Sequence, residues 1–158
     1  MIDGTDRQIL SILQKDARTS NAEIGRRVGM TPSAILERIR KLESRGVVTA
    51  FEARVAPRQV GLGLTAFVFV RTDESPGRHD SARELAELDE VLEVHHIAGE
   101  DCYLAKVVAR DAGDLGRFLR ERVGSIPAVT STRTTVVLET IRESSRLPLG
   151  EEGSDDAE

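Results

Sequence analysis

Residues 20–46 constrain the fold of this chain most, because they hold two sets of helix start and stop signals only a few residues apart. Ser20 followed three residues later by Glu23 predicts a capping box at the start of one short helix. Gly29 suits the left-handed position that ends a helix, and Thr31, which is followed by proline, suits the start of the next. The stretch therefore predicts two helices joined by a tight turn.

The second of these predicted helices is amphipathic. Ile35, Ile39 and Leu42 recur at i, i+4 and i+7, so one stripe is apolar, while the opposite face is mostly charged. Two helices joined by so short a turn fit the helix-turn-helix, whose second helix enters the major groove of DNA. From these residues alone, a small helical hairpin with an ordinary solvated face is the alternative.

A further helix precedes this pair. Thr5 and Gln8 predict a capping box that opens a helix with Ile9, Ile12 and Leu13 on its apolar side. The three helices would form a unit small enough to need help with its core.

The apolar period changes from helical to strand-like after residue 63. The pattern predicts strands at 64–71, 91–98, 102–109 and 129–141, and helices at 81–88 and 111–123. Strand, helix, strand, turn, strand, helix, strand is the order of the ferredoxin-like βαββαβ fold, a four-stranded antiparallel sheet with two helices on one face. We therefore expect an α+β chain in which a winged helix-turn-helix domain precedes a ferredoxin-like domain.

The expected domain organisation follows the same breaks in pattern. It comprises a DNA-binding domain at 1–50, a strand and linker at 51–63, a ferredoxin-like domain at 64–145 and an acidic disordered tail at 146–158. The extended run from Val47 to Val55 is the predicted short strand or wing.

The charge distribution supports this division. Residues 1–50 hold nine basic and six acidic residues, a net charge of +3, although the whole chain carries -5. A basic head on an acidic body is expected when one part of a protein contacts phosphate.

The first predicted strand of the second domain is apolar on both faces. One face holds Leu64, Ala66, Val68 and Val70, and the other holds Phe67 and Phe69. Because the helices can cover only one face, the other would be a large exposed apolar patch on a monomer. We expect a homodimer that buries it through twofold symmetry.

Composition excludes several other classes. There is no apolar run long enough to span a membrane, no signal peptide and a single cysteine, so we expect a cytoplasmic protein. Adjacent His95 and His96 would point to opposite faces of a strand and cannot readily share a metal with Cys102. No nucleotide-binding or hydrolase fingerprint occurs, and we expect no catalytic site, no metal and no cofactor.

With these features in place, the chain resembles the Lrp/AsnC (feast/famine) transcriptional regulators over residues 2–147. The resemblance rests on TDRQILSILQKDARTSNAEIGRRVGMTPSAILERIRKLESRGVV in the head, GEDCYLAKV at the predicted turn and STRTTVVLET in the last strand. It implies that the second half is the family's amino-acid-sensing (RAM) domain, through which members dimerise and often assemble into tetramers or octamers.

The resemblance also implies an effector site, because family members bind small effectors, usually amino acids, near this turn. Carried over, the lining residues are Gly99, Glu100, Asp101, Tyr103, Thr132 and Thr134. Backbone amides of a glycine turn can hold a carboxylate, and an acidic side chain can accept from an α-ammonium group. A plain hairpin turn is the alternative.

The DNA-binding roles follow from the geometry of the motif. We expect the N-terminal residues of the second helix to face base edges: Ser33, Ala34, Glu37 and Arg38. Arg38 is the best candidate for a guanine contact, since a guanidinium can pair with O6 and N7 together. Thr31, Arg26, Arg27 and Lys41 are better placed for phosphates. A dimer would bind an imperfect palindrome with half-sites one helical turn, or a multiple, apart.

Two other functions remain open from the sequence. An oligomeric sensor could bind an amino acid without touching DNA. Some proteins that share this architecture are tetrapyrrole-processing decarboxylases, but those rely on aromatic residues, and only 3% of this chain is aromatic. The expected function is therefore a sequence-specific transcription regulator that responds to an amino acid.

Overall fold

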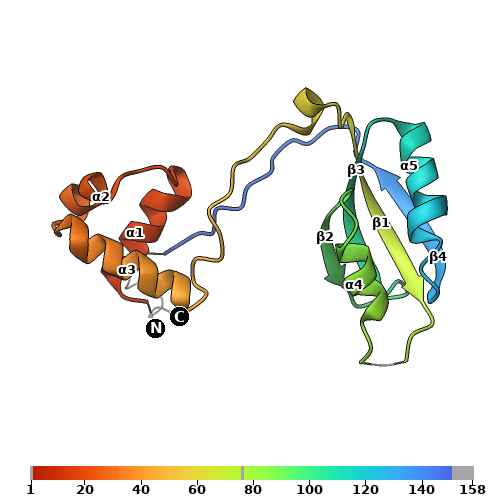
Figure 1. The fold of residues 1–158 in the computed structure, drawn as a ribbon, viewed down its shortest axis with the longest axis horizontal. Helices are drawn as coiled ribbons and strands as arrows, with labels where there is room; N and C mark the ends of the chain where they lie inside the picture. Colours follow the sequence, from red (N-terminus) through yellow and green to blue (C-terminus); the bar gives the residue numbers. More distant parts are fainter. Residues whose placement is uncertain (1, 76, 151–158) are drawn as a thin grey trace, which may run out of the picture. The chain divides into compact units, whose positions relative to one another are not determined.

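The computed structural model describes residues 2–75 and 77–150, which form two compact units (Figure 1). One unit holds the chain up to Ala53 together with the chain that returns from Arg142, and the other holds Arg54–Ile141. The chain therefore passes between the units twice. None of the described helices is long and apolar enough to cross a membrane.

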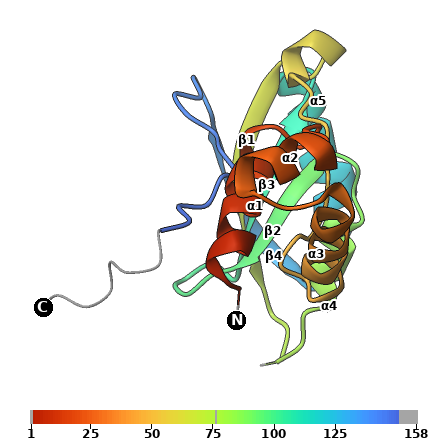
Figure 2. The ribbon, with the colours of Figure 1, turned by 90° about the vertical axis from the view of Figure 1, so that its left-hand side faces the viewer.

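The first unit contains three helices, α1 (Gly4–Lys15), α2 (Asn21–Val28) and α3 (Pro32–Ser44) (Figures 1 and 2). The apolar stripes meet in a small core of Ile9, Leu13, Ile24, Ile35 and Ile39. The turn between α2 and α3 is tight because Gly29 has a φ of 73° and the Met30 amide donates to the Gly25 carbonyl at 2.8 Å. The predicted helix-turn-helix is confirmed.

The helix starts differ in part from the prediction. Thr31 does cap α3, since its hydroxyl accepts from the Ala34 amide at 3.3 Å. The capping box of α1 is formed by Asp3 and Asp6, two residues earlier than predicted, so Thr5 is not the cap. Aspartate caps a helix as well as a residue with a hydroxyl does, so the local sequence did not distinguish Asp3 from Thr5 as the cap.

The predicted capping box of α2 is only half present. Ser20 accepts from the Glu23 amide at 3.2 Å. The Glu23 carboxylate instead forms ion pairs with Arg26 and Arg27 on the next turn of the helix.

No strand lies between α3 and residue 57, so the predicted wing was wrong. The Val47 and Val48 amides donate back to the Leu42 carbonyl and close the end of the helix. Residues 49–56 have no regular secondary structure, and none of the described strands pairs with them. A 3₁₀ turn, η1 (Pro57–Val60), then leads into the second unit.

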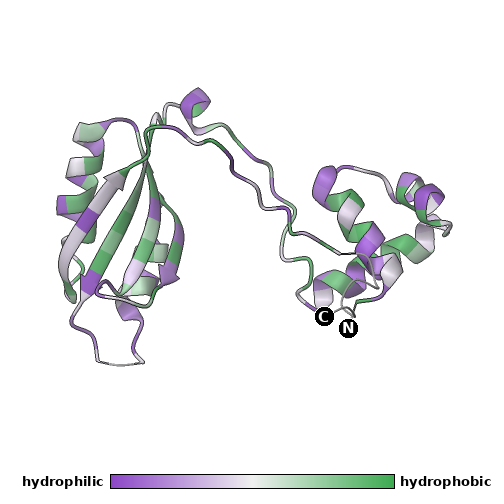
Figure 3. Ribbon diagram, turned by 180° about the vertical axis from the view of Figure 1, so that it is seen from behind, coloured by the Kyte–Doolittle hydropathy of each residue, from purple (hydrophilic) through white to green (hydrophobic). Residues whose placement is uncertain are grey.

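The second unit is the predicted ferredoxin-like domain. Its elements are β1 (Leu64–Thr72), α4 (Asp80–Ala86), β2 (Val91–His96), β3 (Tyr103–Ala109), α5 (Ala112–Phe118) with a π-helical turn η2 (Leu119–Val123), and β4 (Val129–Val136). The strands are antiparallel in the order β2-β3-β1-β4. The green of β1 and β3 in Figure 3 marks the two central strands as the most hydrophobic.

The two faces of the sheet differ in cover. Ala66, Val68 and Val70 of β1 are buried in one core with side chains from α4 and α5. Phe67 and Phe69 point to the other face, opposite Lys106 and Leu104 of β3, and are only half-buried. The predicted division of β1 into a helix-covered face and an open aromatic face is therefore present.

The end of the chain also departs from expectation. β4 ends at Val136, five residues earlier than predicted, and residues 137–150 are irregular. Arg146, Leu147 and Gly150 of the expected disordered tail are hydrogen-bonded to α1. Residues 151–158 of that tail lie outside the described residues.

Candidate functional site

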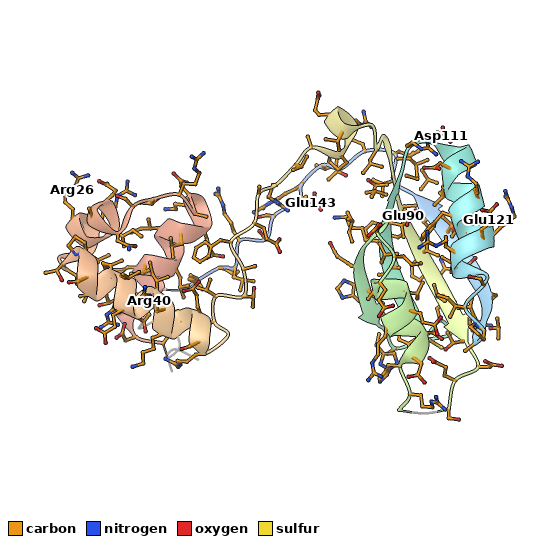
Figure 4. The ribbon with its side chains drawn as sticks, in the orientation of Figure 1. Arg26, Arg40, Glu90, Asp111, Glu121 and Glu143 are labelled. Carbon is orange, nitrogen blue, oxygen red and sulfur yellow. The ribbon has the colours of Figure 1, made fainter. Side chains whose placement is uncertain are left out.

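The solvent face of α3 is the candidate DNA-reading surface. Ser33, Glu37 and Lys41 are exposed along it, and Ala34 is half-buried beside them. Arg40, which we did not include among the expected contacts, is also exposed and projects from α3 in Figure 4. Its position seven residues after Ser33 places it on the same side of the helix, and this spacing could have identified it.

Arg38 does not lie free on this face. Its Nη1 is 2.7 Å from Asp3 Oδ2 and 2.7 Å from Asp6 Oδ1, and only 31% of its side chain is exposed. Hydrogen bonds to Asp3 and Asp6 raise the pKa of Arg38 above its ordinary value. The pKa of Asp3 is lowered chiefly by the hydrogen bond from the Asp6 amide and next by the hydrogen bond from Arg38. Arg38 therefore joins the recognition helix to the N-terminus of α1.

The two expected phosphate-binding arginines of α2 remain accessible. Arg26 and Arg27 both pair with Glu23, yet their side chains are more than half exposed. Figure 4 shows Arg26 projecting outward from α2. Exposed ion pairs of this kind are weak, so phosphate can displace the carboxylate.

A second candidate site lies at the loop between β2 and β3. A hollow of about 500 Å³ is lined by Phe69, Arg71, Ile97, Ala98, Gly99, Glu100, Asp101, Ser131, Thr132 and Arg133. Gly99 has a φ of 138°, a conformation that other residues rarely adopt. Of the expected effector residues, the structure brings Gly99, Glu100, Asp101 and Thr132 together here.

Tyr103 and Thr134 are not brought to this hollow. The Tyr103 ring is 2% exposed on the helix-covered face, where its hydroxyl lies 2.9 Å from His79 Nδ1 and donates to Glu74. Burial raises the pKa of this phenol. Thr134 is opposite the buried Val68, and so belongs to the same face. The resemblance implied both residues. Strand alternation places Tyr103 on the other face, whereas Thr134 lies two residues further along β4 than Thr132 and does not line the hollow.

Two arginines that the sequence reasoning missed complete the hollow. Arg71 Nε donates to the Glu100 carbonyl at 3.1 Å, and Arg133 Nη2 lies 2.9 Å from Asp101 Oδ2. The Arg133 guanidinium also lies 3.8 Å above the Phe69 ring. Only the pairing of β1 with β3 and β4 brings these residues to one place.

The histidines do not form a metal centre. His95 contacts Glu93 at 3.2 Å, whereas His96 lies against the rings of His79 and Tyr103. Among residues 2–75 and 77–150, no group of three or more His, Cys, Asp or Glu side chains could hold a metal ion.

These features define a class of protein: a transcription regulator with a helix-turn-helix unit and a separate ligand-binding unit. Residues 2–43 match the AsnC-type helix-turn-helix domain, and residues 65–147 match the Lrp/AsnC ligand binding domain. The chain belongs to the Lrp/AsnC family of DNA-binding transcriptional regulators.

Similar proteins extend over almost the whole chain. The leucine-responsive regulatory protein of Escherichia coli K12 is 35% identical over 150 residues, which cover 92% of this chain and 90% of that protein. A transcriptional regulator from Neisseria meningitidis in complex with L-Met has a TM-score of 0.86 at 33% identity, covering 94% of this chain and 97% of the other. A feast or famine regulatory protein from Mycobacterium tuberculosis complexed with L-methionine has a TM-score of 0.87 at 33% identity, covering 95% and 100%.

Proposed function

We propose that this regulator binds an amino acid in the hollow beside Gly99, and that the amino acid changes its DNA binding or assembly. The observation that carries the proposal is the presence of two guanidinium groups and two carboxylates around one small cavity. Two similar regulators have structures in complex with methionine, which supports an amino acid as the ligand class. The proposal assigns no catalytic step to the chain.

The charges of the hollow suit a zwitterion. The side chains of the site neutralise one another, because Arg71 pairs with Glu100 and Arg133 pairs with Asp101. An α-carboxylate can take the place of Glu100 on Arg71, since the Glu100 side chain is 93% exposed and weakly held. The α-ammonium group would pair with Asp101, whose side chain is only 16% exposed. Binding then exchanges ion pairs without burying a net charge.

On DNA, the proposed base contacts come from the start of α3 and the phosphate contacts from its flanks. Ser33, Ala34 and Glu37 would face base edges. Thr31, Arg26, Arg27 and Lys41 would contact phosphates. The ion pairs of Arg38 with Asp3 and Asp6 form a clasp between α3 and α1. Arg38 would have to break this clasp to contact a guanine, and the cost would offset part of the binding free energy gained.

A dimer through the open face of the sheet would present two such helices to one operator. Phe67 and Phe69 with Leu104 form an apolar centre on this face, and Glu93 with Lys106 adds an ion pair beside it. This pattern of apolar centre and charged margin is typical of interfaces. The operator would then be an imperfect palindrome, and effector binding between dimers would favour larger assemblies.

Titration calorimetry with a panel of the twenty amino acids tests the effector site. Asp101→Asn should weaken the best ligand by about tenfold or more, because the ammonium loses its charged partner. Asp89→Asn, an exposed acid on another part of the domain, is the matched control and should bind as the parent does. Equal affinity of parent and Asp101→Asn would contradict the site.

Fluorescence anisotropy on DNA from upstream of the protein's own gene tests the response. The titration is repeated at several salt concentrations, with and without the amino acid found by calorimetry. A ligand that binds but leaves DNA affinity and assembly unchanged would contradict its role as an effector.

A further inference from the structure

The last described residues of the chain belong to the DNA-binding unit, where they lie along α1 as a strap (residues 142–150). The contact is centred on Gln14, whose side-chain amide pairs with the backbone of Leu147 in both directions. The Leu147 amide donates to Gln14 Oε1 at 2.6 Å, and Gln14 Nε2 donates to the Leu147 carbonyl at 3.2 Å. The amide side chain of Gln14 thus satisfies both backbone groups of Leu147, as a neighbouring strand would.

Two arginines fix the direction of the strap. Arg146 Nη2 donates to the carbonyl of Lys15 at the end of α1, and Arg7 Nη1 donates to the Gly150 carbonyl near its start, both at 3.4 Å. The strap therefore runs antiparallel to α1. Leu10 lies on the α1 face that also carries Arg7 and Gln14, and it is only 7% exposed.

The strap ends near the place where α1 holds the recognition helix. Arg7, which contacts Gly150, directly follows Asp6, and Asp6 pairs with Arg38 of α3. The next residue, Glu151, begins a run in which five of eight residues are acidic. A strongly negative segment is thus attached directly after Gly150, whereas the first fifty residues of the chain carry a net charge of +3.

We propose that the acidic run 151–158, which follows the strap in the sequence, competes through its carboxylates with DNA phosphates for the cations of α2 and α3. Eight residues span at most about 26–29 Å when extended. Arg38 is the middle residue of the 13-residue α3, which is about 20 Å long, so the rest of α3 extends about 10 Å to either side of the place near which the strap ends. The run lowers non-specific DNA affinity, and a specific operator displaces it by offering base contacts in addition to phosphates.

The first test uses the full chain with the charges removed: Glu151→Gln, Glu152→Gln, Asp155→Asn, Asp156→Asn and Glu158→Gln together. Its affinity for a random-sequence DNA duplex, measured by fluorescence anisotropy, should rise about three- to tenfold at ~50 mM salt. The difference should shrink to less than about twofold at ~300 mM, because salt screens the competing carboxylates. Equal affinity of parent and variant at low salt would overturn the proposal.

The second test separates the strap from the charges. Gln14→Ala removes both hydrogen bonds to Leu147 and should raise low-salt affinity in the parent, but add nothing in the variant without the acids. Gln8→Ala, an exposed glutamine of the same helix, is the matched control and should bind as the parent does. Circular dichroism confirms that each variant is folded. If Gln14→Ala also binds as the parent does, the acidic run acts without the strap and the proposal fails in that part.

Discussion

Arg38 is the residue at which the geometry departs most from the motif-based expectation. The sequence places it on the solvent face of α3, where an arginine is a good guanine reader. In the structure the same guanidinium bridges two carboxylates of α1. Asp3 is the N-cap of α1 and Asp6 lies in its first turn, and only the packing of α1 on α3 brings them within reach of Arg38.

The clasp predicts a stability effect of Asp3. Asp3→Ala removes the N-cap of α1 and one partner of Arg38, and should lower the Tm of the DNA-binding unit by about 3–6 °C. Glu43→Ala, on the exposed surface of α3, should shift it by about 1 °C or less. Thermal unfolding followed by circular dichroism measures both. A Tm for Asp3→Ala equal to that of Glu43→Ala would show that the clasp contributes nothing.

Asp114 predicts the acid sensitivity of the second unit. Hydrogen bonds from Arg110 and Arg117 hold the pKa of Asp114 well below its ordinary value. A lowered folded-state pKa stabilises the unit above about pH 4, and this contribution is lost as the pH falls through the folded-state pKa. Asp114→Asn should therefore unfold more easily than the parent at pH 6, and the gap should narrow at pH 2–3. Urea titrations at these pH values measure it, and a gap that does not change with pH would contradict the assignment.

At the scale of elements, the helix-turn-helix depends on one glycine inside α2. A Cβ atom at Gly25 would lie 2.4 Å from the Met30 carbonyl oxygen, so any side chain here forces the turn away from α2. The close approach allows the Met30 amide to bond to the Gly25 carbonyl.

Gly25→Ala should accordingly destabilise the DNA-binding unit by about 1–3 kcal/mol and weaken DNA binding. Urea unfolding and anisotropy measure the two effects. The oligomeric state, which we propose is set by the other unit, should not change and serves as the control. Unaltered stability would mean that the turn can move away without cost.

The elements that could be predicted are those with a strong local signal. Apolar periodicity located the helices and strands that form the two cores. A buried helix stripe or an alternating strand face requires apolar residues at fixed short spacings, which can be read from the local sequence. The wing failed because Val47 to Val55 has strand-like residues but no described strand to pair with. Arg71 and Arg133 were missed because they reach the hollow only through the register of β1 with β4, which local sequence does not specify.

For the whole molecule, the open face of the sheet predicts the oligomeric state. Phe67→Glu places a charge at the centre of this face and should convert the proposed dimer to monomers, with a rise in the dimer Kd of about 100-fold or more. Sedimentation equilibrium measures the mass. Ser125→Glu, which adds the same charge at an exposed position after α5, should leave the dimer intact. A Phe67→Glu protein that stays dimeric would place the interface elsewhere.

The strap (residues 142–150) has a further consequence for the design of chimaeras that join the DNA-binding unit of one regulator to the ligand-binding unit of another. The DNA-binding module is discontinuous: its boundary cuts the chain once after Ala53 and again before Arg142. A chimaera made with a single junction in the linker would join the α1 of one parent to the C-terminal residues of another. Gln14 would then face a foreign peptide backbone, and Arg7 a foreign carbonyl. Faithful transplantation of the DNA specificity requires two pieces of chain from the same donor.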